Sequence, residues 1–190
     1  ARFRAAECLY RQSKFADAYA HYDAVVKSKD EKYVPNALYR GGDSAGALKR
    51  WPDSQEMYEA LITGFASFYA INEARFGLGL ALQNQNQLDK ALQVYEAVTK
   101  TTSSPTAAKC RFMMGEIVFS RKKYAEASAH FLEVVVGYPA KEQYAEWQAL
   151  AHLEAGRCFI ELKNYEQARE ELQTMVQKFA THARVKDAQA

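Results

Sequence analysis

The sequence predicts an all-α fold in which about five helical hairpins stack into a solenoid that winds as a right-handed superhelix. Three observations predict this class. Small and large apolar residues recur in one register, at intervals of 36, 37, 36 and 41 residues. Within each copy the apolar residues stand three or four positions apart, which is the period of an α-helix. The chain also has no Asn-Gly or Asp-Gly pair and no sustained apolar–polar alternation, so signals for β-strands are weak.

Each repeat is marked by two small residues that stand 12 positions apart. The first is Ala or Gly, and the second is Ala or Ser. The five pairs are Ala6 and Ala18, Gly42 and Ser54, Gly79 and Ala91, Gly115 and Ala127, and Gly156 and Ala168. We predict that these residues let the two helices of each hairpin pack closely, with the second small residue facing the first across the turn.

Large apolar residues keep the same register after each first small residue. Nine positions on stand Phe15, Trp51, Leu88, Tyr124 and Tyr165. Sixteen positions on stand Tyr22, Tyr58, Tyr95, Phe131 and Leu172. Nineteen positions on stand Val25, Leu61, Val98, Val134 and Met175. One hairpin cannot bury such a face by itself, so the hairpins are expected to stack on one another.

The repeats are expected at residues 1–30, 34–66, 69–102, 105–139 and 145–180, in a single array that covers residues 1–190. Residues 181–190 are expected to begin another first helix. Loops that carry Pro35, Pro105 and Pro139 separate the repeats, because proline begins a helix well and continues one badly. The chain begins without Met, in a sequence typical of the middle of a helix, so we expect a fragment of a longer protein.

The composition argues against several classes of function. The net charge is +2 and the longest basic run is residues 121–123, so the chain lacks the basic patch that nucleic-acid binding requires. No apolar stretch is long enough for this segment to insert into a membrane. Cys8, Cys110 and Cys158 are far apart without CxxC spacing, and the histidines are scattered, so no metal or other cofactor is expected.

No arrangement of side chains in the sequence predicts catalysis. Glu170 and Glu171 are neighbours, and adjacent residues on a helix do not face one site. Ser44 follows Asp43, but no histidine stands nearby to complete a nucleophile–base pair. The sequence therefore predicts that the chain is not an enzyme.

Two segments, LGLALQNQNQLDKALQVYEAV and MGEIVFSRKKYAEASAHFLEV, resemble the tetratricopeptide repeat (TPR). The resemblance extends over residues 1–180 and implies a TPR-type helical-hairpin solenoid. The copies depart from the family because they are longer than its usual length of about 34 residues. They also lack its first-helix Trp, whose place is taken by Leu38, Arg75, Arg111 and His152.

The longer copies, with Tyr138 before Pro139 and Lys178 before Phe179, are loosely similar to TPR lipoproteins of bacterial outer-membrane assembly and of the Tol-Pal system. This similarity slightly favours the periplasm or cell envelope as the location. Three cysteines, an odd number without CxxC spacing, instead favour a reducing compartment such as the cytoplasm. The location therefore stays open.

The resemblance implies a concave surface, formed mainly by the first helices, along which a partner binds. Its residues stand three positions before, one after or four after each first small residue, and so share one helical face. The implied groove residues are Phe3, Glu7, Tyr10, Tyr39, Asp43, Phe76, Gln83, Phe112, Glu116, Phe119 and Arg157. The aromatic rings offer a large contact area, and the carboxylates favour basic groups on the partner. Alternatively, the aromatic residues pack between neighbouring first helices.

These features predict a protein-interaction scaffold that holds a peptide or helix of another protein in its groove. A second hypothesis is a structural spacer or self-association element of a multiprotein envelope complex, without a peptide ligand. A third is a regulatory domain attached to an enzyme. Peptide binding and concentration-dependent association are the measurements that separate the first two hypotheses.

Overall fold

The computed structural model describes residues 1–28 and 30–189. Lys29, in the first expected repeat, and Ala190, at the end of the last expected helix, lie outside the described residues. The chain forms two compact units, Ala1–Val94 and Tyr95–Ala190, and the boundary between them falls inside one helix.

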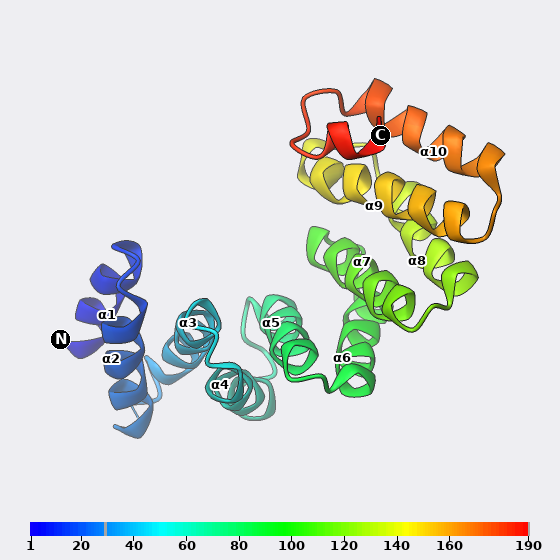
Figure 1. Ribbon diagram of the computed structural model, residues 1–190. Coiled ribbons are helices and arrows are strands. Elements are labelled where there is room, and N and C mark those ends of the chain that lie inside the picture. Colours follow the sequence, from blue (N-terminus) through cyan, green and yellow to red (C-terminus); the bar gives the residue numbers. More distant parts are fainter. Residues whose placement is uncertain (29, 190) are drawn as a thin grey trace. The chain divides into compact units, whose positions relative to one another are not determined.

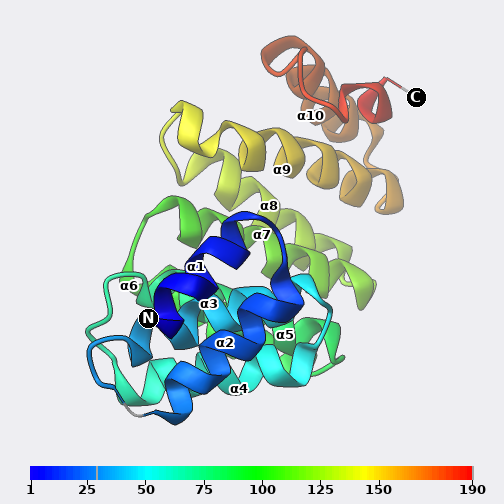
Figure 2. The same ribbon diagram turned by 90° about the vertical axis from the view of Figure 1, so that its left-hand side faces the viewer.

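Unit 1 consists of helices that pack on one another in chain order (Figures 1 and 2). They are α1 (Arg2–Arg11), α2 (Phe15–Lys27), α3 (Val34–Ala47), α4 (Trp51–Gly64), α5 (Ile71–Asn84) and the first part of α6 (Leu88–Thr101). Helix α1 packs on α2, α2 on α3, α3 on α4 and α4 on α5. Because α3 also contacts α5, the first helices of neighbouring repeats meet along one face.

Unit 2 continues in the same way. It holds the rest of α6, then α7 (Pro105–Ser120), α8 (Tyr124–Val136), α9 (Glu142–Glu161), α10 (Tyr165–Lys178) and the 3-10 helix η1 (Val185–Ala188). Helix α7 packs on α8, α8 on α9 and α9 on α10, and α7 also contacts α9. Helix α9 has 20 residues, because the residues inserted before the fifth repeat extend its N-terminal end.

Each expected repeat contains a first and a second helix, and the described residues hold no β-strand. The predicted all-α class and the helical-hairpin solenoid are confirmed. Residues 181–189 differ from the expectation, because they form the short η1 against α10 and not the start of an α-helix. The backbone N–H of Arg184 donates to Nδ1 of His182 at 3.1 Å, a local side-chain contact that competes with helical pairing.

The turn inside each repeat has the same conformation in all five copies. The residue seven positions after the first small residue has a φ between 58° and 60°, in the left-handed region. These residues are Ser13, Lys49, Asn86, Lys122 and Lys163. Side chains other than Gly and Asn are strained there, so most of these turns lack the residue types by which such a turn is recognised in a sequence.

Lys122→Gly is expected to raise the free energy of unfolding of unit 2 by about 0.5–1 kcal/mol, because glycine has no Cβ to clash in the left-handed region. Urea denaturation followed by circular dichroism measures the change. The matched control is Lys123→Gly. Lys123 has a φ of −89°, so glycine there relieves no strain and only makes the unfolded chain more flexible. Equal effects of the two substitutions contradict this account of the turn.

All ten small residues of the repeat register are buried, but the contact that requires glycine differs from the expectation. A Cβ built at Gly42 would lie 2.8 Å from the ring of Tyr58, and one at Gly115 would lie 2.6 Å from the ring of Phe131. At Gly156 the corresponding neighbour is Leu172, at 2.7 Å. In these three repeats the glycine makes room for the large residue 16 positions on, and not chiefly for the small residue 12 positions on.

His130 on α8 is expected to make the stability of unit 2 sensitive to acid. Its Nδ1 is buried without a hydrogen-bond partner among the described residues. Burial, and then the Arg111 guanidinium, lower the pKa of His130 below its ordinary value. The unfolded chain, in which a histidine pKa is about 6.5, therefore binds a proton more readily than the folded chain.

The stability contributed by neutral His130 is expected to be lost as the pH falls from about 7.5 through 6.5 toward the lower pKa of the folded state. His130→Leu removes the titrating group. We expect thermal unfolding temperatures of this variant to decline less than those of the parent over that pH range. Parallel declines in the two proteins would assign the acid sensitivity to other groups.

Candidate functional site

In unit 1 the first helices bring several of the predicted groove residues around one hollow. Tyr10, Tyr39 and Asp43 line it, together with Gly46 of α3 and Leu80 of α5. The hollow has a volume of about 550 Å³. Phe76 and Gln83 of α5 are half-buried and do not line it. Of the five predicted residues in the first two repeats, the structure therefore gathers Tyr10, Tyr39 and Asp43 around one hollow, whereas Phe3 and Glu7 do not line it.

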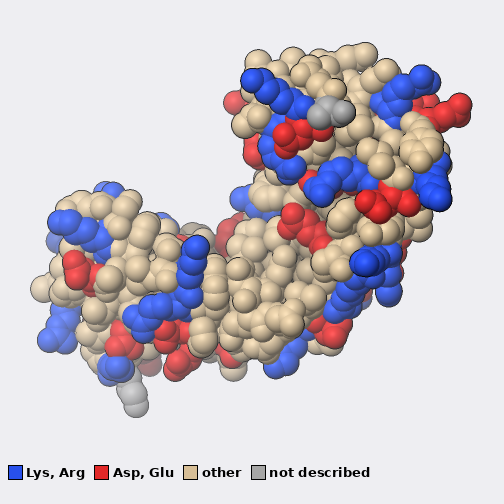
Figure 3. Space-filling model, viewed as in Figure 1, with Lys and Arg blue, Asp and Glu red and all other residues tan. Residues whose placement is uncertain are grey.

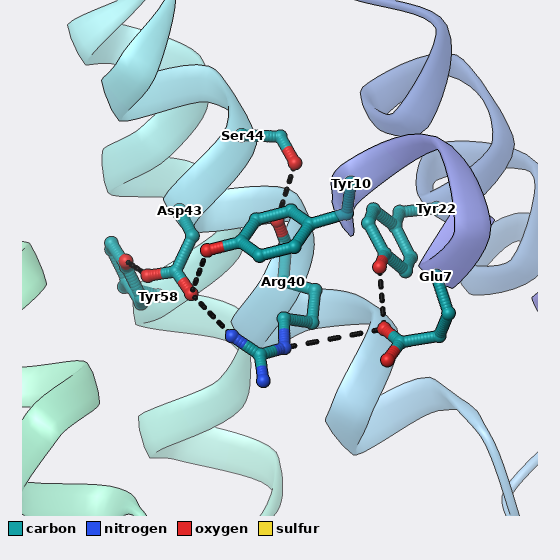
Figure 4. Close-up of polar contacts among 7 residues, drawn as sticks. All are labelled: Glu7, Tyr10, Tyr22, Arg40, Asp43, Ser44 and Tyr58. Atoms are coloured by element: carbon teal, nitrogen blue, oxygen red, sulfur yellow. Dashed lines mark hydrogen bonds and ion pairs between the residues drawn. The ribbon is translucent and has the colours of Figure 1, made fainter. Parts of the chain in front are cut away.

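The centre of this site is Asp43, which accepts hydrogen bonds from side chains of three helices (Figure 4). The hydroxyl of Tyr58 on α4 donates to its Oδ1 at 2.6 Å. The hydroxyl of Tyr10 on α1 and Nη1 of Arg40 donate to Oδ2, each at 3.4 Å. Burial raises the pKa of Asp43 above its ordinary value, and the bonds from Tyr58 and the Arg40 charge offset part of this rise.

Arg40 connects the two predicted carboxylates of unit 1. Its Nε lies 4.0 Å from Oε1 of Glu7, which also accepts a hydrogen bond from the hydroxyl of Tyr22 at 2.5 Å. Its guanidinium carbon lies 4.9 Å from the ring centroid of Tyr10 and 5.5 Å from that of Tyr39. The carboxylates are therefore largely engaged within the protein, which the sequence did not indicate.

Unit 2 holds a comparable hollow on its first helices. Glu116, Phe119 and Arg157, all predicted groove residues, line it with Glu154 and Arg184. Glu154 is buried and accepts from Nη1 of Arg157 at 2.7 Å and from Nη1 of Arg184 at 3.2 Å. Partial desolvation, and then the Glu154 charge, raise the pKa of Glu116 above its ordinary value.

The two sites use the same repeat positions with their charges exchanged. Arg40 and Asp43 form an ion pair at the positions two before and one after Gly42. Glu154 and Arg157 form an ion pair at the same positions around Gly156.

In each site the guanidinium lies over the aromatic residue of the preceding repeat. Arg40 lies 4.9 Å from the ring centroid of Tyr10, and Arg157 lies 5.4 Å from that of Phe119. Both rings in turn make edge contacts, Tyr10 with Phe15 at 5.6 Å and Phe119 with Tyr124 at 5.2 Å between centroids. The arrangement therefore recurs in both units.

Two predicted groove residues instead pack between repeats. Phe112 is only 4% exposed, and its ring centroid lies 5.4 Å from that of Trp147. Phe3 stacks on Tyr33 with centroids 5.1 Å apart. Trp147 and Tyr33 occupy the same position, nine residues before the small residue of the next repeat. The prediction that Phe112 lines a groove is corrected, since its ring is covered.

Sequence reasoning missed Arg40, Glu154 and Arg184. For the first two a signal was available, because Arg40 stands three positions before Asp43 and Glu154 three before Arg157 on predicted helices. Arg184 reaches Glu154 from outside the repeats, so no helical spacing could indicate its contribution.

The face of the molecule drawn in Figure 3 has no dominant charge. Lys and Arg side chains lie among Asp and Glu side chains over the face drawn in Figure 3. Among the described residues no group of three or more His, Cys, Asp or Glu side chains could hold a metal ion. Within the same residues no helix is both long enough and apolar enough to cross a membrane.

Comparison with known proteins places the chain by family and by fold. The tetratricopeptide repeat family matches residues 39–108 and 81–142, and a second description of that repeat matches residues 118–190. No curated protein matches the chain.

Similar solved structures include MamA, with a TM-score of 0.74 and 14% identity over 93% of this chain and 95% of that one. YrrB, described as a TPR protein with an unusual peptide-binding site, has a TM-score of 0.69 and 18% identity over 99% and 90%. The apo form of RapI has a TM-score of 0.76 and 14% identity over 95% and 70%. At these identities the likeness supports the fold alone. Because the family matches extend over more than half of its length, the chain belongs to the tetratricopeptide repeat family.

Proposed function

We propose that this chain is a protein-interaction scaffold that holds a peptide or helix of another protein against the first helices of each unit. The observation that carries the proposal is a guanidinium over an aromatic ring, beside a hollow, in both units. Aromatic rings supply contact area at low entropic cost, and a partly exposed guanidinium has N–H donors for backbone carbonyls of a ligand. The peptide-binding site ascribed to YrrB, a protein of similar fold, supports the same reading.

The two sites differ in charge, and so in the partner groups they favour. In unit 1 the carboxylates of Glu7 and Asp43 face the single guanidinium of Arg40. In unit 2 two carboxylates and two guanidinium groups lie together, so their charges balance. We therefore expect basic groups of the partner to bind at unit 1.

Selection of displayed random peptides against the chain tests this function. Arg157→Gln and Phe119→Ala are each expected to lower the affinity for peptides that bind at unit 2 by roughly tenfold, which is the effect of removing one central contact. Tyr165→Ala is the control, because Tyr165 is exposed and lies outside this hollow. Circular dichroism checks that each variant is folded. Failure to select any peptide, or equal affinity of all three variants, contradicts the proposal.

Self-association is a second candidate, favoured by apolar side chains at the end of unit 2. Ile160, Leu162 and Tyr165 are 45%, 42% and 65% exposed, and a hollow runs along α10 beside Leu172 and Val176. An envelope complex, as the loose similarity to outer-membrane lipoproteins suggests, would be one setting for such a spacer. Sedimentation velocity separates the candidates. Concentration-dependent association that is lost in Tyr165→Ala but kept in Arg157→Gln, without peptide binding, favours self-association.

A further inference from the structure

The hollow of unit 1 lies where one repeat lacks a side chain that the others have. Four positions after the first small residue, the other repeats carry Tyr10, Gln83, Phe119 and Ile160. The second repeat carries Gly46 at this position, and Gly46 lines the hollow with Tyr10, Tyr39, Trp51 and Tyr58. Four aromatic rings therefore surround the space from which the side chain is missing.

Neither the backbone nor the packing requires a glycine at this position. Gly46 does not have a positive φ, since no described glycine does. A Cβ built there would lie 3.5 Å from Oγ of Ser54 and 3.8 Å from the ring of Trp51, both ordinary contacts. Gly42 differs, because a Cβ there would collide with a buried ring. A glycine inside a helix destabilises it relative to alanine, so Gly46 costs stability that no neighbouring contact explains.

The lining indicates the chemistry of an occupant. Aromatic rings favour a bulky apolar side chain, which they contact on several sides. The cation position between Tyr10 and Tyr39 is already filled by Arg40, so a second cation would not enter there. Around Arg40, the carboxylates of Asp43 and Glu7 together carry one more charge than Arg40 balances. A basic group is therefore favoured beside the hollow and not inside it.

We propose that the hollow at Gly46 is a specificity pocket that receives one bulky apolar side chain of a bound peptide, next to a basic residue of that peptide. This inference rests on the proposed scaffold function and narrows it for unit 1. Gly46 then determines which peptides bind, because any larger residue there would occupy the space meant for the ligand.

Three capped peptides test the pocket by their effect on the amide NMR signals of Gly46 and Gly77, both of which line it. The reference is acetyl-Gly-Trp-Lys-Gly-amide. One variant peptide has Ala in place of Trp, and the other has Glu in place of Lys. We expect the reference to shift both signals saturably, the Ala peptide to bind roughly tenfold more weakly, and the Glu peptide several-fold more weakly. Equal binding of the Ala peptide, or no saturable shift with any peptide, overturns the inference.

Substitutions in the protein test the pocket independently of the peptide variants. Gly46→Leu is expected to fill the pocket and abolish reference binding, with an unfolding temperature equal to or above that of the parent. Gly46→Ala fills less space and is expected to weaken binding partially, which keeps the test valid should the leucine distort the helix. Gly64→Ala is the control, since a Cβ at Gly64 meets nothing within 4 Å and Gly64 does not line the hollow.

The outcomes separate this inference from the scaffold function on which it rests. Displayed peptides that bind the chain, with affinities unchanged by Gly46→Leu, overturn the pocket and leave the scaffold function standing. Failure to select any peptide, together with no shift at Gly46, overturns both.

Discussion

Gly77→Ala is expected to destabilise unit 1 by about 2–4 kcal/mol, although alanine is the better helix former. A Cβ built at Gly77 would overlap the ring of Tyr58, which is 4% exposed. The ring cannot retreat, because Gly42 contacts it closely from α3. Displacing it would also strain the hydrogen bond from the Tyr58 hydroxyl to Asp43. Tyr58 is thus held between glycines of two neighbouring repeats.

Urea denaturation of Gly77→Ala gives the loss, and two further variants show its cause. Gly64→Ala, also in unit 1, is expected to leave stability unchanged or raise it by up to about 1 kcal/mol, because its Cβ would meet no atom within 4 Å. In a Tyr58→Ala background the ring is absent, so Gly77→Ala should become neutral or stabilising. If Gly77→Ala lowers the free energy of unfolding equally in both backgrounds, this would falsify the explanation that its Cβ collides with the Tyr58 ring.

Gly77 also shows what the sequence could and could not reveal about the fold. The register of Ala, Gly and aromatic residues predicted the helices and their order, because it reports contacts that every repeat makes within itself. Gly77 stands outside that register, since its partner Tyr58 belongs to the preceding repeat. The wrong prediction for Phe112 has the same cause, because Trp147, which covers its ring, belongs to the following repeat. Contacts between repeats vary with the residue that each neighbour supplies, so one repeat pattern does not specify them.

Helical spacing indicated which side chains of the candidate site share a face, but not the contacts that they make. Tyr10, Tyr39 and Asp43, which share the helical face predicted for the groove, line one hollow. The carboxylates were expected to be available to basic groups of a partner. Arg40 and two tyrosine hydroxyls of the chain itself already donate hydrogen bonds to Asp43. Spacing along a helix indicates which side chains share a face. It does not show which of them bond to one another across three helices.

Asp43→Ala is the second substitution expected to have a large effect, a loss of about 2–4 kcal/mol from the stability of unit 1. Removing the carboxylate leaves the buried Tyr58 hydroxyl without an acceptor and Arg40 without its partner on α3. Asp43→Asn is expected to cost less, about 1–2 kcal/mol, because its amide oxygen can still accept from Tyr58. Urea denaturation at neutral pH ranks the two variants.

A double-mutant cycle tests whether Tyr58 and Asp43 act as one unit. Tyr58→Phe alone is expected to be destabilising, because it removes the hydroxyl from Asp43 while the ring stays in place. In the Asp43→Ala background the same change should be neutral or stabilising, since it then removes a buried hydroxyl that has lost its acceptor. Additive effects of the two substitutions would show that the hydrogen bond contributes no coupling.

The pH dependence of these variants has a definite sign. The folded-state pKa of Asp43 is raised by burial, so the folded chain binds this proton at a higher pH than the unfolded chain does. Protonation of Asp43 therefore favours folding, and its contribution to stability rises as the pH falls from neutral through the raised pKa. Asp43→Asn cannot take up this proton. Its deficit relative to the parent is thus expected to grow on acidification, whereas a deficit that shrinks would mean that the Arg40 ion pair outweighs burial and that the pKa of Asp43 is lowered.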